Sequence, residues 1–227
     1  MSDEIVRYRR EEKVAVIEMD DGKVNAISQV MIDALNHALD RAEKEAKAIV
    51  LAGRPGRFSG GFDLSVMRGG AAQARALVGG GAELALRLYG FSLPVVIACT
   101  GHAIAMGAVL LLSADTRLGA EGSFKIGLNE VAIGLAVPPF AMRLAEARLS
   151  KRHLVRATLE AEIYAPSQAV DAGFLDRVGS SQALAVDALA EANRLAALDA
   201  SAFQATKVGL RSDTIARIRA EEGTLRP

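Results

Sequence analysis

The stretch Phe124-Lys125-Ile126-Gly127-Leu128-Asn129-Glu130 ends an apolar run on one carboxylate, that of Glu130, with little charge around it. A carboxyl group in apolar surroundings has its charged form disfavoured, so we expect the pKa of Glu130 to rise toward the range that suits proton transfer. Two glycine-bearing turns stand upstream, Phe58-Ser59-Gly60-Gly61-Phe62-Asp63-Leu64 and Gly101-His102-Ala103-Ile104-Ala105-Met106-Gly107. Glycine lets a ligand come close to backbone N–H groups. A buried acid with two such turns is suited to forming and holding an enolate.

Outward from these motifs, strand and helix patterns alternate. Residues 4–19 alternate apolar and polar side chains about Glu11 and Glu12, which predicts a hairpin. Ser28 is placed to cap a helix with an apolar face on Met31, Leu35, Leu39 and Ala42. Short apolar runs at 48–52 and 95–99 predict buried strands. The alternation predicts an α/β fold with a largely parallel inner sheet.

Two further regions have their own patterns. The glycine-rich stretch 69–81 predicts a connector, either a mobile loop near the site or a plain link, that leads into a helix around residues 83–88. From about Pro138 onward helical patterns dominate, at residues 139–147, 151–159, 167–172, 183–197 and 202–220.

Composition excludes several classes of function. The 227 residues are 51% hydrophobic, and 27 Lys and Arg balance 27 Asp and Glu, so no overall charge favours nucleic acid or a membrane surface. Aromatic residues make up 4% and Trp is absent, which argues against base stacking. The single cysteine, Cys99, fits a reducing compartment, and the N-terminus has no secretory pattern, so we expect a cytoplasmic protein. The apolar residues 93–114 predict a buried strand and helix rather than a membrane span.

Each motif taken alone has a plainer explanation. Residues 59–61 are also consistent with an ordinary tight turn, residues 101–107 with close helix–sheet packing, and Glu130 with a helix cap. His102 is typical of a partly buried histidine more than of an acid–base group. Ser59 lacks the Gly-x-Ser-x-Gly elbow of a nucleophile, and no nucleotide-binding fingerprint or metal-ligand cluster occurs, so no metal is expected. The order of the three motifs along one chain favours the catalytic interpretation.

These residues, in this order, resemble the crotonase family, also called the enoyl-CoA hydratase/isomerase superfamily. The resemblance implies a crotonase (ClpP/crotonase-like) fold, with repeated ββα units forming a spiral core over residues 1–175 and a C-terminal helical oligomerisation region over 176–227. Residues 165–178 resemble a later signature of the family. Acyl-CoA would be the substrate, with no cofactor beyond its coenzyme A thioester. The protein would be a homotrimer or dimer of trimers, with its C-terminal helices crossing the interface.

The resemblance also assigns site residues. The oxyanion N–H groups would fall on Gly60 and Met106, and the acid–base group on Glu130. The Met106 side chain would then point away from the thioester, and Val109, Val131, Ile133 and Leu135 would desolvate the carboxylate. Substrate and coenzyme A contacts would come from Lys23, Val24, Asn25, Ala26, Ser59, Gly61, Phe62, Asp63, Val109 and Lys207. Arg54 and Arg211 are further candidates for the coenzyme A phosphates.

One departure from the family pattern separates the possible activities. Hydratases of the family carry a second glutamate where this chain has Val109, and adding water calls for two proton-handling groups. The Δ3,Δ2-enoyl-CoA isomerases keep only the later glutamate, often within Ile-Gly-Leu-Asn-Glu, as at residues 126–130. This favours a fatty acyl-CoA isomerase with Glu130 as its one base. The alternatives are a hydratase or another acyl-CoA reaction, in which Asp63 or Glu83 compensates, and a non-catalytic acyl-CoA-binding protein.

Overall fold

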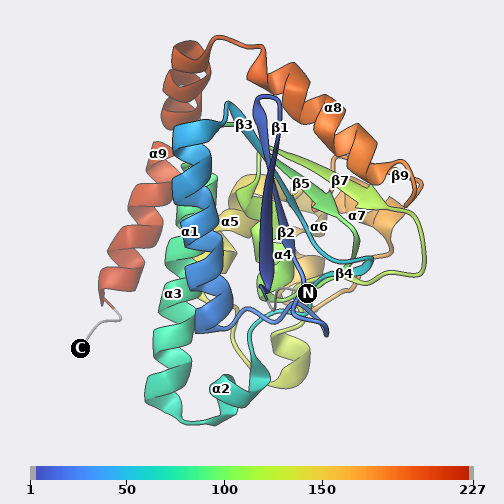
Figure 1. Cartoon of the computed structure of the whole chain (residues 1–227). Helices are drawn as coiled ribbons and strands as arrows, with labels where there is room; N and C mark the ends of the chain where they lie inside the picture. Colours follow the sequence, from blue (N-terminus) through green and yellow to red (C-terminus); the bar gives the residue numbers. More distant parts are fainter. Residues whose placement is uncertain (1–3, 225–227) are drawn as a thin grey trace.

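The computed structural model describes residues 4–224, which form two sheets built from repeated strand–strand–helix units (Figure 1). In three successive units the first strand joins a six-stranded sheet and the second joins a three-stranded sheet. The large sheet has the order β1 (Val6–Glu11), β2 (Val14–Met19), β3 (Ala48–Ala52), β5 (Val95–Cys99), β7 (Thr116–Ala120) and β9 (Arg177–Gly179). The small sheet has the order β4 (Gly56–Ser59), β6 (Gly101–Ile104) and β8 (Ile126–Gly127).

The hairpin β1–β2 is antiparallel, and every other pair in the large sheet is parallel. This confirms the predicted α/β fold with a parallel inner sheet. The sequence pattern gives no separate signal for β4, β6, β8 and β9, since each has only two to four residues. Short strands carry too few alternating positions to be recognised. β9 belongs to the large sheet although it lies beyond residue 175, so the C-terminal region contributes to the core.

Helices cover both faces of the large sheet. The helices of the described residues are α1 (Gln29–Glu45), α2 (Leu64–Arg68), α3 (Ala71–Tyr89), α4 (Met106–Ser113), the 3-10 turn η1 (Val131–Ile133), α5 (Pro139–Arg148), α6 (Lys151–Thr158), α7 (Pro166–Ala172), α8 (Leu184–Ala196) and α9 (Ala200–Thr224). Alternate strand residues point to opposite faces, so Ile49 and Leu51 pack on the face with α1, α3 and α4. Val50 and Val96 pack on the other face against α8, which crosses the sheet obliquely (Figure 1).

The predicted first helix is confirmed in detail. The Ser28 hydroxyl oxygen accepts a hydrogen bond from the Met31 backbone N–H, 3.2 Å away, as an N-cap should. Met31, Leu35, Leu39 and Ala42 are all buried. The predicted helices beyond Pro138 are present as α5 to α9. Along the part of the chain that the structure describes, no helix has both the length and the apolar character needed to cross a membrane.

The prediction for residues 69–81 is wrong. From Ala71 this stretch is the first half of α3, which continues without a break through three consecutive glycines at 79–81 (Figure 1). Glycine has low helix propensity, but Leu77, Leu84 and Leu88 of α3 are buried in the main core. Tertiary packing of these side chains therefore holds the helix where local propensity alone does not.

Candidate active site

The early loop at residues 23–26 is fixed by a buried asparagine. Asn25 has a positive φ of 52° and is fully buried, and its side-chain nitrogen donates to the carbonyl oxygens of Met19, Arg57 and Phe58 at 3.0–3.1 Å. Its side-chain oxygen accepts from the Asp21 N–H. These contacts use the whole amide group. Asn25 therefore holds the loop in place with its side chain, which is not available to a ligand; contact of the loop with coenzyme A stays a prediction.

Asp21 supports the same loop and was not singled out from the sequence. Its carboxylate accepts hydrogen bonds from the backbone N–H groups of Lys23, Asn25 and Ala26 at 2.7–2.9 Å. Burial opposes ionisation of this carboxyl, but these N–H donors outweigh it and lower the pKa of Asp21. The sequence signal was an Asp two residues before Lys23, the spacing of an Asx turn. Lys23 and Val24 remain exposed at the tip of the loop, and Ala26 is half-buried.

The first glycine turn shows that one predicted oxyanion donor is wrong. The Gly60 N–H donates to the Val24 carbonyl oxygen at 2.8 Å, and the Gly61 N–H donates to the Ser59 hydroxyl at 3.2 Å. The Ser59 hydroxyl in turn donates to the Asn25 carbonyl oxygen at 2.8 Å, so this buried side chain is also structural. Among the hydrogen bonds of residues 4–224, none uses the Phe62 N–H. Phe62, not Gly60, presents the free donor of this turn.

The second glycine turn presents a donor at the predicted residue. Ala105 has φ 51°, a conformation that is rare for a residue with a side chain, and the helix α4 starts directly after it at Met106. As the first residue of a helix, Met106 has an N–H without an intrahelical partner, and no hydrogen bond of the described residues uses it. Its side chain is buried. The dipole of α4 adds partial positive charge at this N–H.

The two turns lie against each other. A Cβ built on Gly61 would lie 3.0 Å from the Ala105 Cβ and 3.5 Å from the Met106 nitrogen. A Cβ built on Gly107 would lie 2.9 Å from the Ser59 Cβ, closer than packed side chains come, so this position needs glycine. The peptide that carries the Phe62 N–H is therefore beside the Met106 N–H, and the pair can bind one developing oxyanion.

Glu130 follows β8, which is joined to the second turn by the Ala105 N–H donating to the Gly127 carbonyl oxygen at 3.0 Å. The Glu130 side chain is buried, with 8% of its surface exposed, and its Oε2 atom has no hydrogen-bond partner. Burial disfavours the charged form and raises the pKa of Glu130. The buried Asn129 side-chain oxygen beside it is also unpartnered. The carboxyl group is thus available as a base of raised pKa, as the sequence predicts.

The source of this desolvation differs in part from the prediction. Val109 is buried, but Val131, Ile133 and Leu135 are exposed at 42%, 53% and 47%. They lie on η1 and the loop after it, which turns through Gly134 with φ 78°. About half of each of these three side chains is open to solvent, so they are not the fully buried apolar surroundings that the sequence predicts.

Neither carboxylate proposed as a second acid is placed for that role. Asp63 caps α2, its carboxylate accepting hydrogen bonds from the Ser65 hydroxyl and N–H at 2.6 and 2.8 Å. These hydrogen bonds lower the pKa of Asp63 and keep it ionised. Glu83 is exposed and lines a groove between α3 and α9.

Two of the cations predicted to contact coenzyme A phosphates are buried instead. The Lys207 ammonium group lies 2.6 Å from the Asp115 carboxylate and donates to the carbonyl oxygens of Phe91 and Leu93. The Arg211 guanidinium is 2.9 Å from the same carboxylate. Both tether α9 to the core and are unavailable to a ligand. Arg54 lies at the early loop, where it donates to the Lys23 carbonyl oxygen at 3.1 Å.

His102 has a structural contact that accounts for it. Its Nδ1 atom accepts a hydrogen bond from the Lys125 N–H at 3.0 Å, and its ring meets Phe124 edge-on. Partial burial, together with the charges of Arg57 and Lys125, lowers the pKa of His102. The histidine therefore joins β6 to the segment before β8 in its neutral form.

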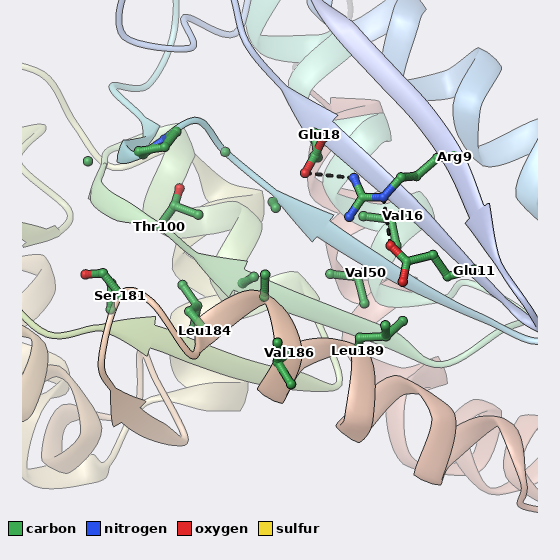
Figure 2. A pocket seen from close by; sticks show the side chains of 17 residues that line it. Arg9, Glu11, Val16, Glu18, Val50, Thr100, Ser181, Leu184, Val186 and Leu189 are labelled. Carbon is green, nitrogen blue, oxygen red and sulfur yellow. Dashed lines mark hydrogen bonds and ion pairs between the residues drawn. The ribbon is translucent and has the colours of Figure 1, made fainter.

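A separate pocket of about 500 Å³ lies under α8, on the face of the large sheet opposite to the one that packs against α1, α3 and α4 (Figure 2). Its floor is apolar, with Val16 and Val50, and Leu184 and Leu189 form the wall from α8. The charged groups at its edge pair with one another, since Arg9 binds the carboxylates of both Glu11 and Glu18. None of the predicted site residues lines this pocket, so the candidate site is at the two turns and Glu130.

Comparisons with known proteins show the family to which the chain belongs. The Enoyl-CoA hydratase/isomerase family model matches residues 9–222. Over 210 residues the chain is 30% identical to mitochondrial enoyl-CoA delta isomerase 1 of Homo sapiens, covering 90% of this chain and 70% of the human protein. It is 38% identical over 133 residues to a probable enoyl-CoA hydratase of Rhodobacter capsulatus, covering 54% of this chain and 49% of that protein.

Among solved structures, an enoyl-CoA hydratase/isomerase family protein from Pseudomonas syringae superposes with a TM-score of 0.96 at 42% identity, covering 98% of this chain and 96% of that one. The spiral of ββα units with its helical C-terminal region is therefore the crotonase fold, which confirms the predicted fold class. The chain belongs to the enoyl-CoA hydratase/isomerase family.

Proposed function

We propose that this protein moves the double bond of a 3-enoyl-CoA from C3 to C2, with Glu130 as its single acid–base group. The observation that carries the proposal is a buried carboxyl group of raised pKa whose Oε2 atom has no hydrogen-bond partner, with the apolar Val109 in place of a second carboxylate. The similarity to the human enoyl-CoA delta isomerase supports the same reaction. One carboxylate is enough for it, because the base that removes a proton is regenerated when it returns the proton.

The chemistry follows from the positions of the donors. The thioester oxygen binds between the N–H groups of Phe62 and Met106. Glu130 takes a proton from C2, and the C–H bonding pair becomes part of a dienolate whose negative charge rests on that oxygen. Each N–H donor stabilises this charge by about 3–4 kcal/mol. The protonated Glu130 then delivers the proton to C4, which leaves the double bond between C2 and C3.

The coenzyme A part of the substrate is assigned to the outer side of the first turn. The exposed tip of the early loop, at Lys23 and Val24, would contact the adenosine part, with the half-buried Ala26 beside it. Lys23 and Arg54 supply positive charge there, and Arg57 on β4 adds a further exposed cation that the sequence did not single out. These cations replace Lys207 and Arg211 as partners for the phosphates, because their side chains are not held in the core.

The alternative is hydration of a 2-enoyl-CoA, which the similarity to a probable enoyl-CoA hydratase supports. Hydration would need two proton-handling groups, one to activate the water and another to handle the second proton. The low pKa of Asp63 and the place of Glu83 in a different groove argue against both candidates for that role. A non-catalytic acyl-CoA-binding protein would have no use for a buried carboxyl group with an unpartnered oxygen atom, which costs stability.

The test follows isomerisation of a 3-enoyl-CoA and hydration of a 2-enoyl-CoA by absorbance, in the wild type, Glu130→Gln and Asp63→Asn. We expect isomerisation without appreciable hydration, a loss of about 10²–10⁴-fold in kcat for Glu130→Gln, and little change for Asp63→Asn. Efficient hydration by the wild type would overturn the proposal. Binding of coenzyme A esters without turnover in either assay would favour the binding protein.

A further inference from the structure

The middle of α3 holds three glycines in a row, Gly79, Gly80 and Gly81. Each glycine inside a helix lowers helix stability by about 1 kcal/mol relative to alanine, so we asked what each of the three glycines makes room for. A Cβ built on Gly79 meets no atom within 4 Å, and a Cβ on Gly80 meets Ile32 Cδ1 at 3.3 Å. A Cβ on Gly81 would lie only 2.5 Å from Cε1 and Cζ of the Phe62 ring, and 3.5 Å from the Met106 methyl carbon.

Gly81 therefore leaves a notch in α3 that the ends of two side chains occupy. Those side chains belong to Phe62 and Met106, the same two residues whose backbone N–H groups are free at the candidate oxyanion site. Phe62 and Met106 come from different turns, 44 positions apart in the sequence, and α3 is the element at which both side chains end. The buried position of Met106 shows that its side chain is enclosed there.

We propose that Gly81 is a positioning residue for the oxyanion site: its missing side chain lets α3 receive Phe62 and Met106 and so fixes the directions of their two N–H groups. This inference rests on the proposed function. The backbone around Phe62 has little freedom to adjust, because the Ile27 N–H donates to the Gly61 carbonyl oxygen at 2.8 Å and the Asp63 N–H donates to the Ile27 carbonyl oxygen at 3.1 Å. A Cβ at position 81 displaces the ring by about 1 Å to reach ordinary contact, and its strain passes to the peptide that carries the N–H.

The experiment compares Gly81→Ala with Gly79→Ala, which makes the same change in helix propensity but meets nothing. Misplacing a catalytic group by about 1 Å can cost up to about 100-fold in rate. We expect Gly81→Ala to lower kcat for 3-enoyl-CoA by about 10–100-fold, with KM changed less than about threefold. Gly79→Ala is expected to leave both unchanged. The double variant Gly81→Ala/Phe62→Leu removes the two ring carbons that collide, so it should recover most of the lost kcat.

A second measurement separates this inference from the proposed function. The free energies of unfolding of wild type, Gly81→Ala, Phe62→Leu and the double variant form a cycle that reports the contact without any turnover. A wild type without isomerase activity would refute the proposed function, whatever the cycle shows. An active wild type whose kcat survives Gly81→Ala within about twofold would overturn the positioning role alone. If the double variant Gly81→Ala/Phe62→Leu does not recover kcat, the positioning role is also overturned, since the loss of kcat would then come from general damage to the fold.

Discussion

The burial that suits Glu130 to its proposed role as a base also lowers the stability of the folded protein. Its carboxyl is buried and Oε2 has no partner, and burial raises its pKa above the ordinary value of 4.5. The native state therefore keeps the proton to a higher pH than the unfolded state. Between pH 4.5 and the raised pKa, the native state binds more protons, so the free energy of unfolding falls as pH rises. Above the raised pKa the whole penalty is present.

Glu130→Gln should accordingly be more stable than the wild type at pH 8, because the neutral amide removes a buried charge; we expect a gain of about 1–3 kcal/mol, the scale of the desolvation penalty of a buried polar group. The difference should shrink as the pH is lowered from 8 to 4.5, because the raised pKa leaves most of the wild-type carboxyl protonated and uncharged at pH 4.5. Urea unfolding at the two pH values measures this. Glu12→Gln, at an exposed glutamate of the β1–β2 turn, is the control and should show no such trend. An equal or larger gain at pH 4.5 would mean that the Glu130 carboxyl is not desolvated.

At the same scale, the sequence predicts some roles and misses others for identifiable reasons. The burial of Glu130 and the free N–H of Met106 can be predicted because they depend on local context, an apolar run and a helix start. Gly60 cannot be excluded from sequence, because its N–H is taken by Val24, a residue 36 positions away that only folding brings near. The burial of Lys207 is equally hidden from sequence, because it depends on Asp115, which is 92 positions away.

At the scale of elements, the long helix α9 is held to the core by a buried ion cluster. The Asp115 carboxylate contacts Lys207 at 2.6 Å and Arg211 at 2.9 Å, and it accepts a hydrogen bond from the Val95 N–H at 2.7 Å. Both cations are at most 5% exposed. Burial lowers the pKa of Lys207 even though Asp115 opposes this. The single carboxylate is therefore the group that makes two buried positive charges tolerable.

Asp115→Asn should destabilise the protein by about 3–5 kcal/mol, because it leaves both cations without an anion. Lys207→Met should cost clearly less, since Asp115 keeps Arg211 and the Val95 N–H. Asp40→Asn breaks the half-exposed pair between Asp40 and Arg87 and is expected to cost at most about 1 kcal/mol. Urea denaturation of the three variants gives the comparison. A loss for Asp115→Asn no greater than that for Asp40→Asn would show that the cluster does not hold α9.

Helix α3 shows a limit of predicting secondary structure from local sequence. The glycines at 79–81 favour a loop when read locally, and they form a helix because the side chains around them reach the core. The capped helix α1 was predictable because its cap, its apolar face and its burial all agree. The strands of the small sheet are too short for a pattern, so the second layer of the fold follows from the family resemblance and not from periodicity.

At the scale of the whole molecule, the two sheets explain why one fold can be recognised from three short motifs. Each ββα unit places one strand in the large sheet and one in the small sheet. The strands β4, β6 and β8 are parallel neighbours, so their C-terminal ends lie at one edge of the small sheet. The two glycine turns and the segment with Glu130 follow these three strands and therefore start at that same edge. The motifs far apart in sequence meet because the topology repeats.

The same molecule exposes apolar side chains that an isolated chain would normally cover. On α9, Val208 and Leu210 are 56% and 74% exposed, and the family resemblance predicts a trimer whose C-terminal helices cross the interface. We expect light scattering after size exclusion to give about three times the chain mass of 23.9 kDa, or six times for a dimer of trimers. Val208→Asp/Leu210→Asp should reduce this to the monomer mass, because a buried charge in an interface costs several kcal/mol. Leu159→Asp, at a 68% exposed side chain directly after the short helix α6, provides the control. A monomeric wild type would contradict the trimer, and a trimer broken only by Leu159→Asp would place its interface on α6 instead of α9.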